Sequence, residues 1–310
     1  MAEKMATRQA YGQALVEIGA KNKDLVVLDA DLSKSTMTVK FSETYPERFF
    51  NMGIAEQNMY GVAAGLASSG KVVVASSFAM FATGRAFEII RNAIGYPHIN
   101  VKICATHAGV TVGEDGATHQ AIEDLALMRE IPGMTVINPS DGVSAKKALE
   151  AAVEMQGPCY VRFGRAAVPV VYDESLEFEI GKGILVKKGT DVTLIATGIM
   201  VNEAIEAAKI LDVQGINARV IDIHTIKPID EEIIIQAAKE TGGIVTCEEH
   251  SVIGGLGSAV AEVTSKYAPA KIRMIGVQDR FGQSGKPDQL MKEYGLTAED
   301  IVAAAKEVLK

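Results

Sequence analysis

The 310-residue sequence lacks the features that mark membrane, secreted and nucleic-acid-binding proteins. No stretch approaches the roughly 18 apolar residues of a membrane span, and the first residues, MAEKMATRQAYGQ, contain no apolar core of a signal peptide. Asp and Glu (39) outnumber Lys and Arg (31) without long runs of one sign, which argues against a surface for nucleic acid or acidic lipid. We therefore expect a cytoplasmic protein with no nucleic-acid partner and no membrane partner.

Cysteine is also scarce. The three cysteines, Cys104, Cys159 and Cys247, are widely spaced and form no CxxC pair. This pattern argues against a disulfide framework and against a zinc site. We expect buried, reduced thiols.

Short β-branched runs alternate with longer amphipathic stretches, which is typical of strands and crossover helices in a parallel sheet. The runs in the first part are apolar throughout, as expected when helices cover both faces of a sheet. They begin at Leu25, Lys71, Asn100, Met134 and Cys159. Helices are expected near residues 5–20, 55–69, 82–94, 119–130 and 143–156. The predicted fold class is α/β.

A turn-rich segment interrupts the alternation between Pro169 and Gly189. We place a domain boundary near residue 188, which gives domains at 1–188 and 189–310. The second, smaller α/β domain is predicted to have strands at 191–198, 218–223, 242–250 and 271–281, and helices near 200–212, 230–240 and 255–267. Its polar strand ends, among them His224 and Glu249, have no metal-ligand spacing, and we assign this domain no catalytic residue.

Polar or aromatic residues follow the strands of the first domain: Asp31, Phe78, His107, Asp141 and Arg165. In open α/β sheets, ligands bind outside the carboxyl ends of the strands, so these residues indicate a binding site along one edge. The alternative is that strand ends are polar simply because they are solvated.

The segment GIAEQNMYGVAAGLASSG predicts a helix made almost entirely of small or apolar residues. Gly61 and Gly65 would let a second helix approach closely, either inside the protein or from a symmetry mate. Glu56, at the start of the helix, would then be poorly solvated, so it needs a raised pKa, a hydrogen-bond donor, or both. The alternative is an exposed glutamate that favours the helix dipole.

GIAEQN followed by a small-residue helix is similar to the glutamate segment of transketolases and of deoxyxylulose-phosphate synthases. This resemblance implies that thiamine diphosphate is the cofactor and that Glu56 hydrogen-bonds its aminopyrimidine ring. Glu56 would share a proton with that ring and so promote cofactor deprotonation.

The segment SSFAMFATGRAFEIIRN places Phe78 and Phe81 three residues apart. Such aromatic residues are core residues by default. The similar segment of transketolases stacks its rings against the aminopyrimidine, which implies a cofactor-binding role for Phe78 and Phe81. The third aromatic residue of that segment corresponds to Gly84, so this wall of the pocket would be filled by Phe87 or by a partner chain.

The loop THAGVTVGEDGATHQ is followed by a predicted helix and contains His107, Asp115 and His119. The histidines are twelve residues apart (119 − 107), which fits no common zinc pattern, and we expect no metal bound by this chain. The loop resembles the transketolase pattern, which implies that His107, Asp115 and His119 bind the sugar. His107 and His119 join Glu56 as catalytic candidates, and His119 is the proton-transfer candidate.

Three further positions resemble the transketolase residues that hold a sugar phosphate: Arg8, Ser35 and Arg165. Guanidinium groups suit phosphate geometry, so the set favours a phosphorylated substrate. Asp31 and Leu32 match a segment that approaches the cofactor in that family.

No Gly-Asp-Gly motif, which holds the diphosphate through a metal ion in thiamine diphosphate enzymes, occurs in the chain. The resemblance begins at the middle domain of transketolases. We therefore expect a partner, an N-terminal transketolase subunit with the diphosphate-binding domain, which would bind Mg or Ca. A homodimer contact within a heterotetramer is the expected assembly.

Three interpretations remain open at this point. The first is a transketolase subunit that transfers a two-carbon ketol unit from a ketose phosphate to an aldose phosphate, in the pentose phosphate pathway of carbohydrate metabolism. The second is a beta-type subunit of a 2-oxo acid dehydrogenase or a deoxyxylulose-phosphate synthase-like enzyme. The third is a non-catalytic assembly or regulatory subunit. The GEDGATHQ loop favours the first over the second, and retention of Glu56, His107 and Asp115 argues against the third.

Overall fold

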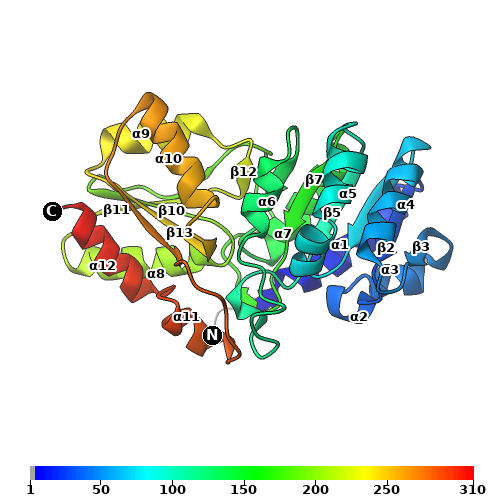
Figure 1. Cartoon of the computed structure of the whole chain (residues 1–310). Coiled ribbons are helices and arrows are strands. Elements are labelled where there is room, and N and C mark those ends of the chain that lie inside the picture. Colours follow the sequence, from blue (N-terminus) through cyan, green and yellow to red (C-terminus); the bar gives the residue numbers. More distant parts are fainter. Residues whose placement is uncertain (1–3) are drawn as a thin grey trace.

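Two mainly parallel sheets lie side by side and form the framework of residues 4–310, the part of the chain described by this computed structural model (Figure 1). The first has seven strands in the order β12, β6, β7, β5, β4, β2, β3. Along the chain these are β2 (Leu25–Asp29), β3 (Phe49–Asn51), β4 (Val72–Ser76), β5 (Val101–Ala105), β6 (Thr135–Ile137), β7 (Cys159–Arg162) and β12 (Thr225–Lys227). All neighbours pair in parallel except β12, which is antiparallel to β6.

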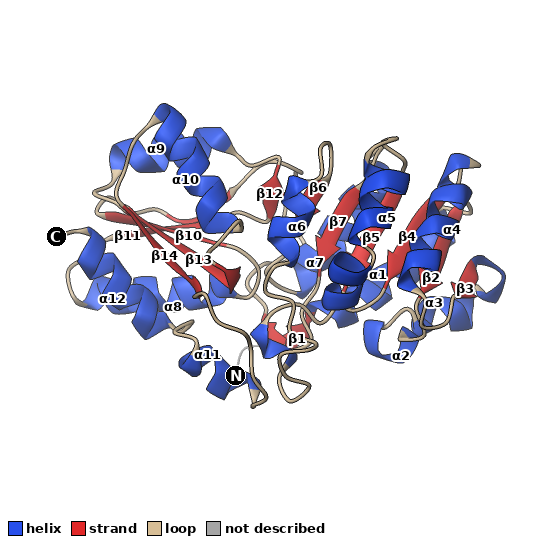
Figure 2. Ribbon diagram, viewed as in Figure 1, coloured by secondary structure: helices blue, strands red, loops and turns tan. Residues whose placement is uncertain are grey.

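Helices cover both faces of this sheet, as the apolar runs predict (Figure 2). One face carries α1 (Thr7–Lys21), α3 (Val39–Thr44) and α7 (Gly142–Glu154). The other carries α4 (Glu56–Ser68), α5 (Phe87–Ile89) and α6 (Asp124–Glu130). A short helix, α2 (Ser33–Thr36), follows β2, and wide helical turns at 80–85 and 90–95 flank α5.

The second sheet has five strands, in the order β14, β13, β10, β11, β9. They are β9 (Ile184–Lys187), β10 (Val192–Ala196), β11 (Ala218–Asp222), β13 (Ile244–Ser251) and β14 (Ile272–Val277), with β9 antiparallel. One face is covered by α8 (Met200–Val213) and α12 (Ala298–Val308), and the other by α9 (Glu231–Glu240) and α10 (Leu256–Tyr267). The α11 helix (Pro287–Glu293) packs against the helical turn Val110–Val112, and β1 (Lys4–Ala6) and β8 (Ala167–Pro169) form a small antiparallel pair.

The predicted α/β fold class is confirmed, and so are the buried free thiols of the three cysteines. The boundary near residue 188 stays a prediction. The two sheets share an apolar core, because Ile223 and Ile226 from the second part pack in the same cluster as residues of the first sheet. The β12 strand, which the sequence did not predict, adds residues 225–227 to the first sheet.

Two local predictions are wrong. The helix predicted over 119–130 begins only at Asp124, because the preceding loop closes on itself: Gly109 N donates to Ala121 O at 2.8 Å. Asp141, expected along the edge of the binding site, is fully buried as the cap of α7. Its carboxylate accepts four hydrogen bonds, from the backbone N–H groups of Ser144, Val171 and Tyr172 and from the Ser144 hydroxyl, so it has no capacity left for a ligand.

Candidate active site

Glu56 opens α4 and is 1% exposed, so its carboxylate must be satisfied from within the protein. Ser77 Oγ, just after β4, donates to Glu56 Oε1 at 3.3 Å, and Arg85 Nη1 donates to Oε2 at 2.8 Å. The predicted hydrogen-bond donor is therefore present. Sequence reasoning did not identify Ser77 or Arg85 as these donors, since neither position stands out by type or spacing.

Four rings gather beside this carboxylate. Phe78 and Phe81 are stacked with centroids 6.0 Å apart, and His107 stacks on Phe78 at 3.8 Å. His119 meets Phe81 edge-on at 5.2 Å, and the Arg85 guanidinium lies 4.9 Å from the centre of the Phe81 ring. The structure thus brings the glutamate segment, the aromatic segment and the two histidines of the loop into one cluster.

The space beside Gly84 is taken by Met80. A Cβ at Gly84 would lie 2.7 Å from Met80 Cε, so the flexible thioether fills the place where a longer side chain would start. Phe87, the candidate within this chain for that wall, packs against the apolar core of the first sheet instead. The sequence could not predict this arrangement, because it depends on the wide helical turn at 80–85.

His107 adopts a left-handed backbone conformation (φ 58°) and is 3% exposed. Its Nδ1 shares a hydrogen bond with Thr106 Oγ1 at 2.9 Å. Burial, with smaller contributions from Arg8, Arg165 and His119, lowers the pKa of His107 to about 3. At neutral pH this imidazole is uncharged and can offer one N–H to a ligand.

The predicted basic residues, Arg8 and Arg165, lie close enough to His107 for their charges to lower its pKa. Arg8 Nη1 donates to Ser35 O at 2.6 Å, which brings these two residues together. Arg165 Nη1 donates to Glu114 Oε2 at 2.9 Å, in the loop where Asp115 is exposed. Burial and then repulsion from Arg165 lower the pKa of Arg8. Two guanidinium groups that repel one another form an environment that favours a bound anion.

Asp31 and Leu32 follow β2, on the far side of β4 from β5. Asp31 Oδ1 accepts from Asn51 Nδ2 at 3.0 Å, and Leu32 N donates to Asp29 Oδ1 at 2.6 Å. The buried Asp29 also accepts from two threonine hydroxyls, so it fixes this turn. Within residues 4–310, no hydrogen bond joins Asp31 or Leu32 to the Glu56 cluster.

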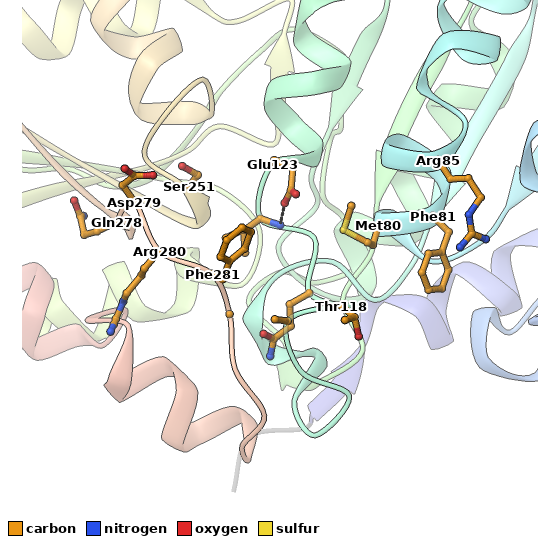
Figure 3. A pocket seen from close by; sticks show the side chains of 14 residues that line it. Met80, Phe81, Arg85, Thr118, Glu123, Ser251, Gln278, Asp279, Arg280 and Phe281 are labelled. Atoms are coloured by element: carbon orange, nitrogen blue, oxygen red, sulfur yellow. Dashed lines mark hydrogen bonds between the residues drawn. The ribbon is translucent and has the colours of Figure 1, made fainter.

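A cavity of about 650 Å³ adjoins the cluster between the two domains (Figure 3). The first domain contributes Phe81, Arg85 and Thr118, and the second contributes Ser251 and the segment 278–282. Glu56 and His107 do not line it. The cavity is therefore a space next to the rings rather than the centre of the candidate site.

Within residues 4–310, none of the helices combines the length and the apolar character that a membrane span requires. In the same range, no group of three or more His, Cys, Asp or Glu side chains is placed to hold a metal ion.

The seven-stranded sheet has the ring cluster at the carboxyl ends of β4 and β5, and the five-stranded sheet follows it in the chain. This arrangement is that of a pyrimidine-binding domain followed by a smaller C-terminal domain. Family models match accordingly: "Transketolase, pyrimidine binding domain" covers residues 3–170, and "Transketolase, C-terminal domain" covers 181–301. The chain belongs to the transketolase family, whose members depend on thiamine diphosphate.

Relatives align over nearly the whole chain. It is 54% identical to a putative transketolase C-terminal section of Methanocaldococcus jannaschii, over 98% of this chain and 96% of the relative. It is 44% identical to the 6-deoxy-6-sulfo-D-fructose transketolase subunit SqwH of Clostridium sp., over 97% and 94%. A solved structure of a split-gene transketolase, described as an inactive beta4 tetramer, matches with a TM-score of 0.93 and 56% identity, over 98% of each chain.

Human transketolase is longer. The chain is 39% identical to it over 99% of its own length, but spans only 49% of the human chain. The relatives thus fall into two kinds, subunits of about this length and single chains of about twice the length. These names support the transketolase interpretation among the three that the sequence left open.

Proposed function

We propose that this chain provides the groups that activate the cofactor ring and recognise the sugar in a two-subunit transketolase. The observation that carries this proposal is the Glu56 cluster: a buried carboxylate beside two stacked phenylalanines and a neutral histidine. The reaction would transfer a two-carbon ketol unit from a ketose phosphate to an aldose phosphate.

The donor set of the cluster fits thiamine diphosphate. When bound, this cofactor supplies the carbanion chemistry of the transfer. Glu56 Oε1 is held only by a long bond from Ser77 (3.3 Å), so it can turn to a ring nitrogen of an aminopyrimidine and hold a proton there. Phe78 and Phe81 offer ring faces for that pyrimidine, and Arg85 keeps the second carboxylate oxygen in place.

The neighbouring loop and basic residues suit a sugar phosphate. Neutral His107 would donate a hydrogen bond to a substrate oxygen, and His119 would move a proton to or from the reacting oxygen. Asp115 would accept from a hydroxyl. Arg8, Ser35 and Arg165 would hold the phosphate, which the repulsion between the two guanidinium groups supports.

The partner would be an N-terminal transketolase subunit that binds the diphosphate through Mg or Ca, because this chain has no Gly-Asp-Gly motif. The half-length alignment with human transketolase supports this division of the site. One face of α4 leaves Gly61 and Gly65 exposed with nothing within 4 Å of a Cβ there, which suits a homodimer contact within a heterotetramer. We place the enzyme in the cytoplasm and in the pentose phosphate pathway.

Reconstitution tests this proposal. The chain alone should show no transketolase activity, and mixing it with a transketolase subunit that contains Gly-Asp-Gly should produce activity dependent on thiamine diphosphate and Mg. Ketose and aldose phosphates are the substrates to supply, with the partner subunit alone as control. Full activity from this chain without a partner would contradict the division of the site.

A further inference from the structure

The loop of residues 107–121, here named the substrate loop, is packed against the second domain. Val110 is fully buried in the apolar cluster of that domain, together with Val277 and Leu290. Its start and end are joined by the pairing of Ala108 with Ala121. The loop that would present the two histidines to a sugar is therefore seated on a domain to which the sequence assigned no role in the site.

Glu249 makes the most specific contact between this domain and the loop. Glu249 is 2% exposed, and its Oε1 accepts a hydrogen bond from Thr111 N at 2.6 Å. The carboxylate lies against the backbone of Gly109, where an added Cβ would be 2.2 Å from Glu249 Cδ. Gly109 also has φ +79°, so glycine is required there for two independent reasons.

Arg162 ties this contact to the first sheet. Its Nη2 donates to Glu249 O at 3.0 Å and to Ala121 O, at the end of the substrate loop, at 3.3 Å. The guanidinium is itself fixed by Asp124, with Nε to Oδ2 at 2.7 Å. Glu249 and the closing residue of the loop are thus held by one buried cation.

A second contact from the same domain supports the far end of the loop. Gln120 Nε2 donates to Gln283 O at 3.0 Å and also to Val110 O within the loop. The loop has positive φ at Gly113 and Gly116 as well as at Gly109. Such a glycine-rich backbone has much conformational freedom to lose, so its geometry depends on contacts of this kind.

We propose that Glu249 is a positioning residue for sugar binding: through Thr111 N it sets the substrate loop, and with it His107 and His119, in the geometry that receives the sugar. This inference rests on the proposed function, and it gives the second domain a part in the site. A shift of about 1 Å in a group that binds substrate can cost about a hundredfold in rate, so one backbone hydrogen bond can matter here.

Glu248 provides a matched control. It is adjacent in sequence, fully buried, and accepts two backbone hydrogen bonds, but these come from Leu256 N and Gly257 N at the start of α10. Glu248→Asp and Glu249→Asp therefore make the same chemical change at buried sites. They differ in whether the substrate loop is contacted.

The test uses the complex of this chain with its partner subunit and the variants Glu249→Ala, Glu249→Asp and Glu249→Gln. Loss or shortening of the carboxylate should raise KM for the ketose phosphate by about tenfold or more and lower kcat less, while thiamine diphosphate affinity stays within about twofold. Glu249→Gln should restore most of the KM, because its amide oxygen can accept from Thr111 N. Glu248→Asp, the matched control, should leave KM unchanged.

Amide hydrogen exchange of the full chain gives a readout apart from activity. Residues 108–121 should exchange faster in Glu249→Ala and Glu249→Asp, but as in the wild type in Glu249→Gln and Glu248→Asp. If Glu249→Ala does not fold, the aspartate variant carries the test. Wild-type KM and wild-type exchange in Glu249→Ala and Glu249→Asp would overturn the inference and leave the proposed function standing. A wild-type complex without transketolase activity would overturn the proposed function. The exchange measurement would still test whether Glu249 holds the substrate loop through Thr111 N.

Discussion

Both domains have polar residues at their strand ends, but they use them in different ways. In the first domain, Ser77 and His107 follow β4 and β5, where Ser77 contacts Glu56 and His107 stacks on Phe78. Arg85, which also contacts Glu56, has a half-exposed side chain. In the second domain, Glu248 is fully buried, and each of its carboxylate oxygens accepts a backbone N–H at the start of α10. A polar strand end therefore indicates a site only where its groups are not already satisfied inside the protein.

The largest effect expected from this comparison concerns Glu56. Glu56→Gln keeps the shape of the side chain and can still bond to Ser77, so the chain should fold. It cannot exchange a proton with the cofactor ring, and loss of such general acid–base assistance costs about 10² to 10⁴ in rate. Hydrogen–deuterium exchange at C2 of thiamine diphosphate in the reconstituted complex measures this step. Wild-type exchange in the variant would remove Glu56 from the proposed role.

The domain junction should show a large effect on stability instead. Asp124 is fully buried and accepts from Arg162 and from Tyr160 Oη at 2.6 Å. Asp124→Ala would leave a buried guanidinium without its counterion, which typically costs about 3 to 5 kcal/mol. Denaturant unfolding measures the loss. Exposed Asp279→Ala is the control and should change stability by less than about 0.5 kcal/mol. Equal stability of the two variants would contradict the importance of the buried pair.

The pH dependence of stability should have opposite signs in the two regions. Burial raises the pKa of Glu249 to about 7 from 4.5, although Arg162 opposes this shift. The folded chain then holds a proton that the unfolded chain has lost, so this contribution is complete below pH 4.5 and disappears as the pH rises through about 7. His107, with its pKa lowered to about 3 from 6.5, contributes stability that is present above pH 6.5 and is lost as the pH falls.

Denaturant unfolding at several pH values measures the contributions of Glu249 and His107 separately. Glu249→Gln should flatten the fall in stability between about pH 4.5 and 7 by about 1 to 3 kcal/mol. His107→Gln should flatten the fall below about pH 6.5 and leave the higher range unchanged. If Glu249→Gln had the same slope as the wild type across the upper range, the buried carboxyl would not titrate there.

Much of the fold and part of the candidate site could be predicted from sequence because the determinants are local. The continuous apolar runs predict the parallel strands, and the position of Glu56 at the start of a small-residue helix predicts its burial. Arg85 was missed because its contact depends on the wide turn at 80–85. Glu249 was missed because it contacts a residue 138 positions away. Long-range hydrogen bonds to the backbone leave no pattern of residue types.

The smallest effect concerns the exposed face of α4, which differs from the filled interior of both domains. Gly61 is exposed, has nothing within 4 Å of a Cβ, and lies inside a helix. In the isolated chain Gly61→Ala should therefore stabilise the helix, by about 0.5 to 1 kcal/mol.

If this face forms the homodimer contact, Gly61→Leu should nevertheless weaken assembly, because a close helix approach has no room for a large side chain. Thermal unfolding and sedimentation of the two variants measure both effects. A Gly61→Leu variant that assembles like the wild type would show that the contact lies on another surface of the first domain.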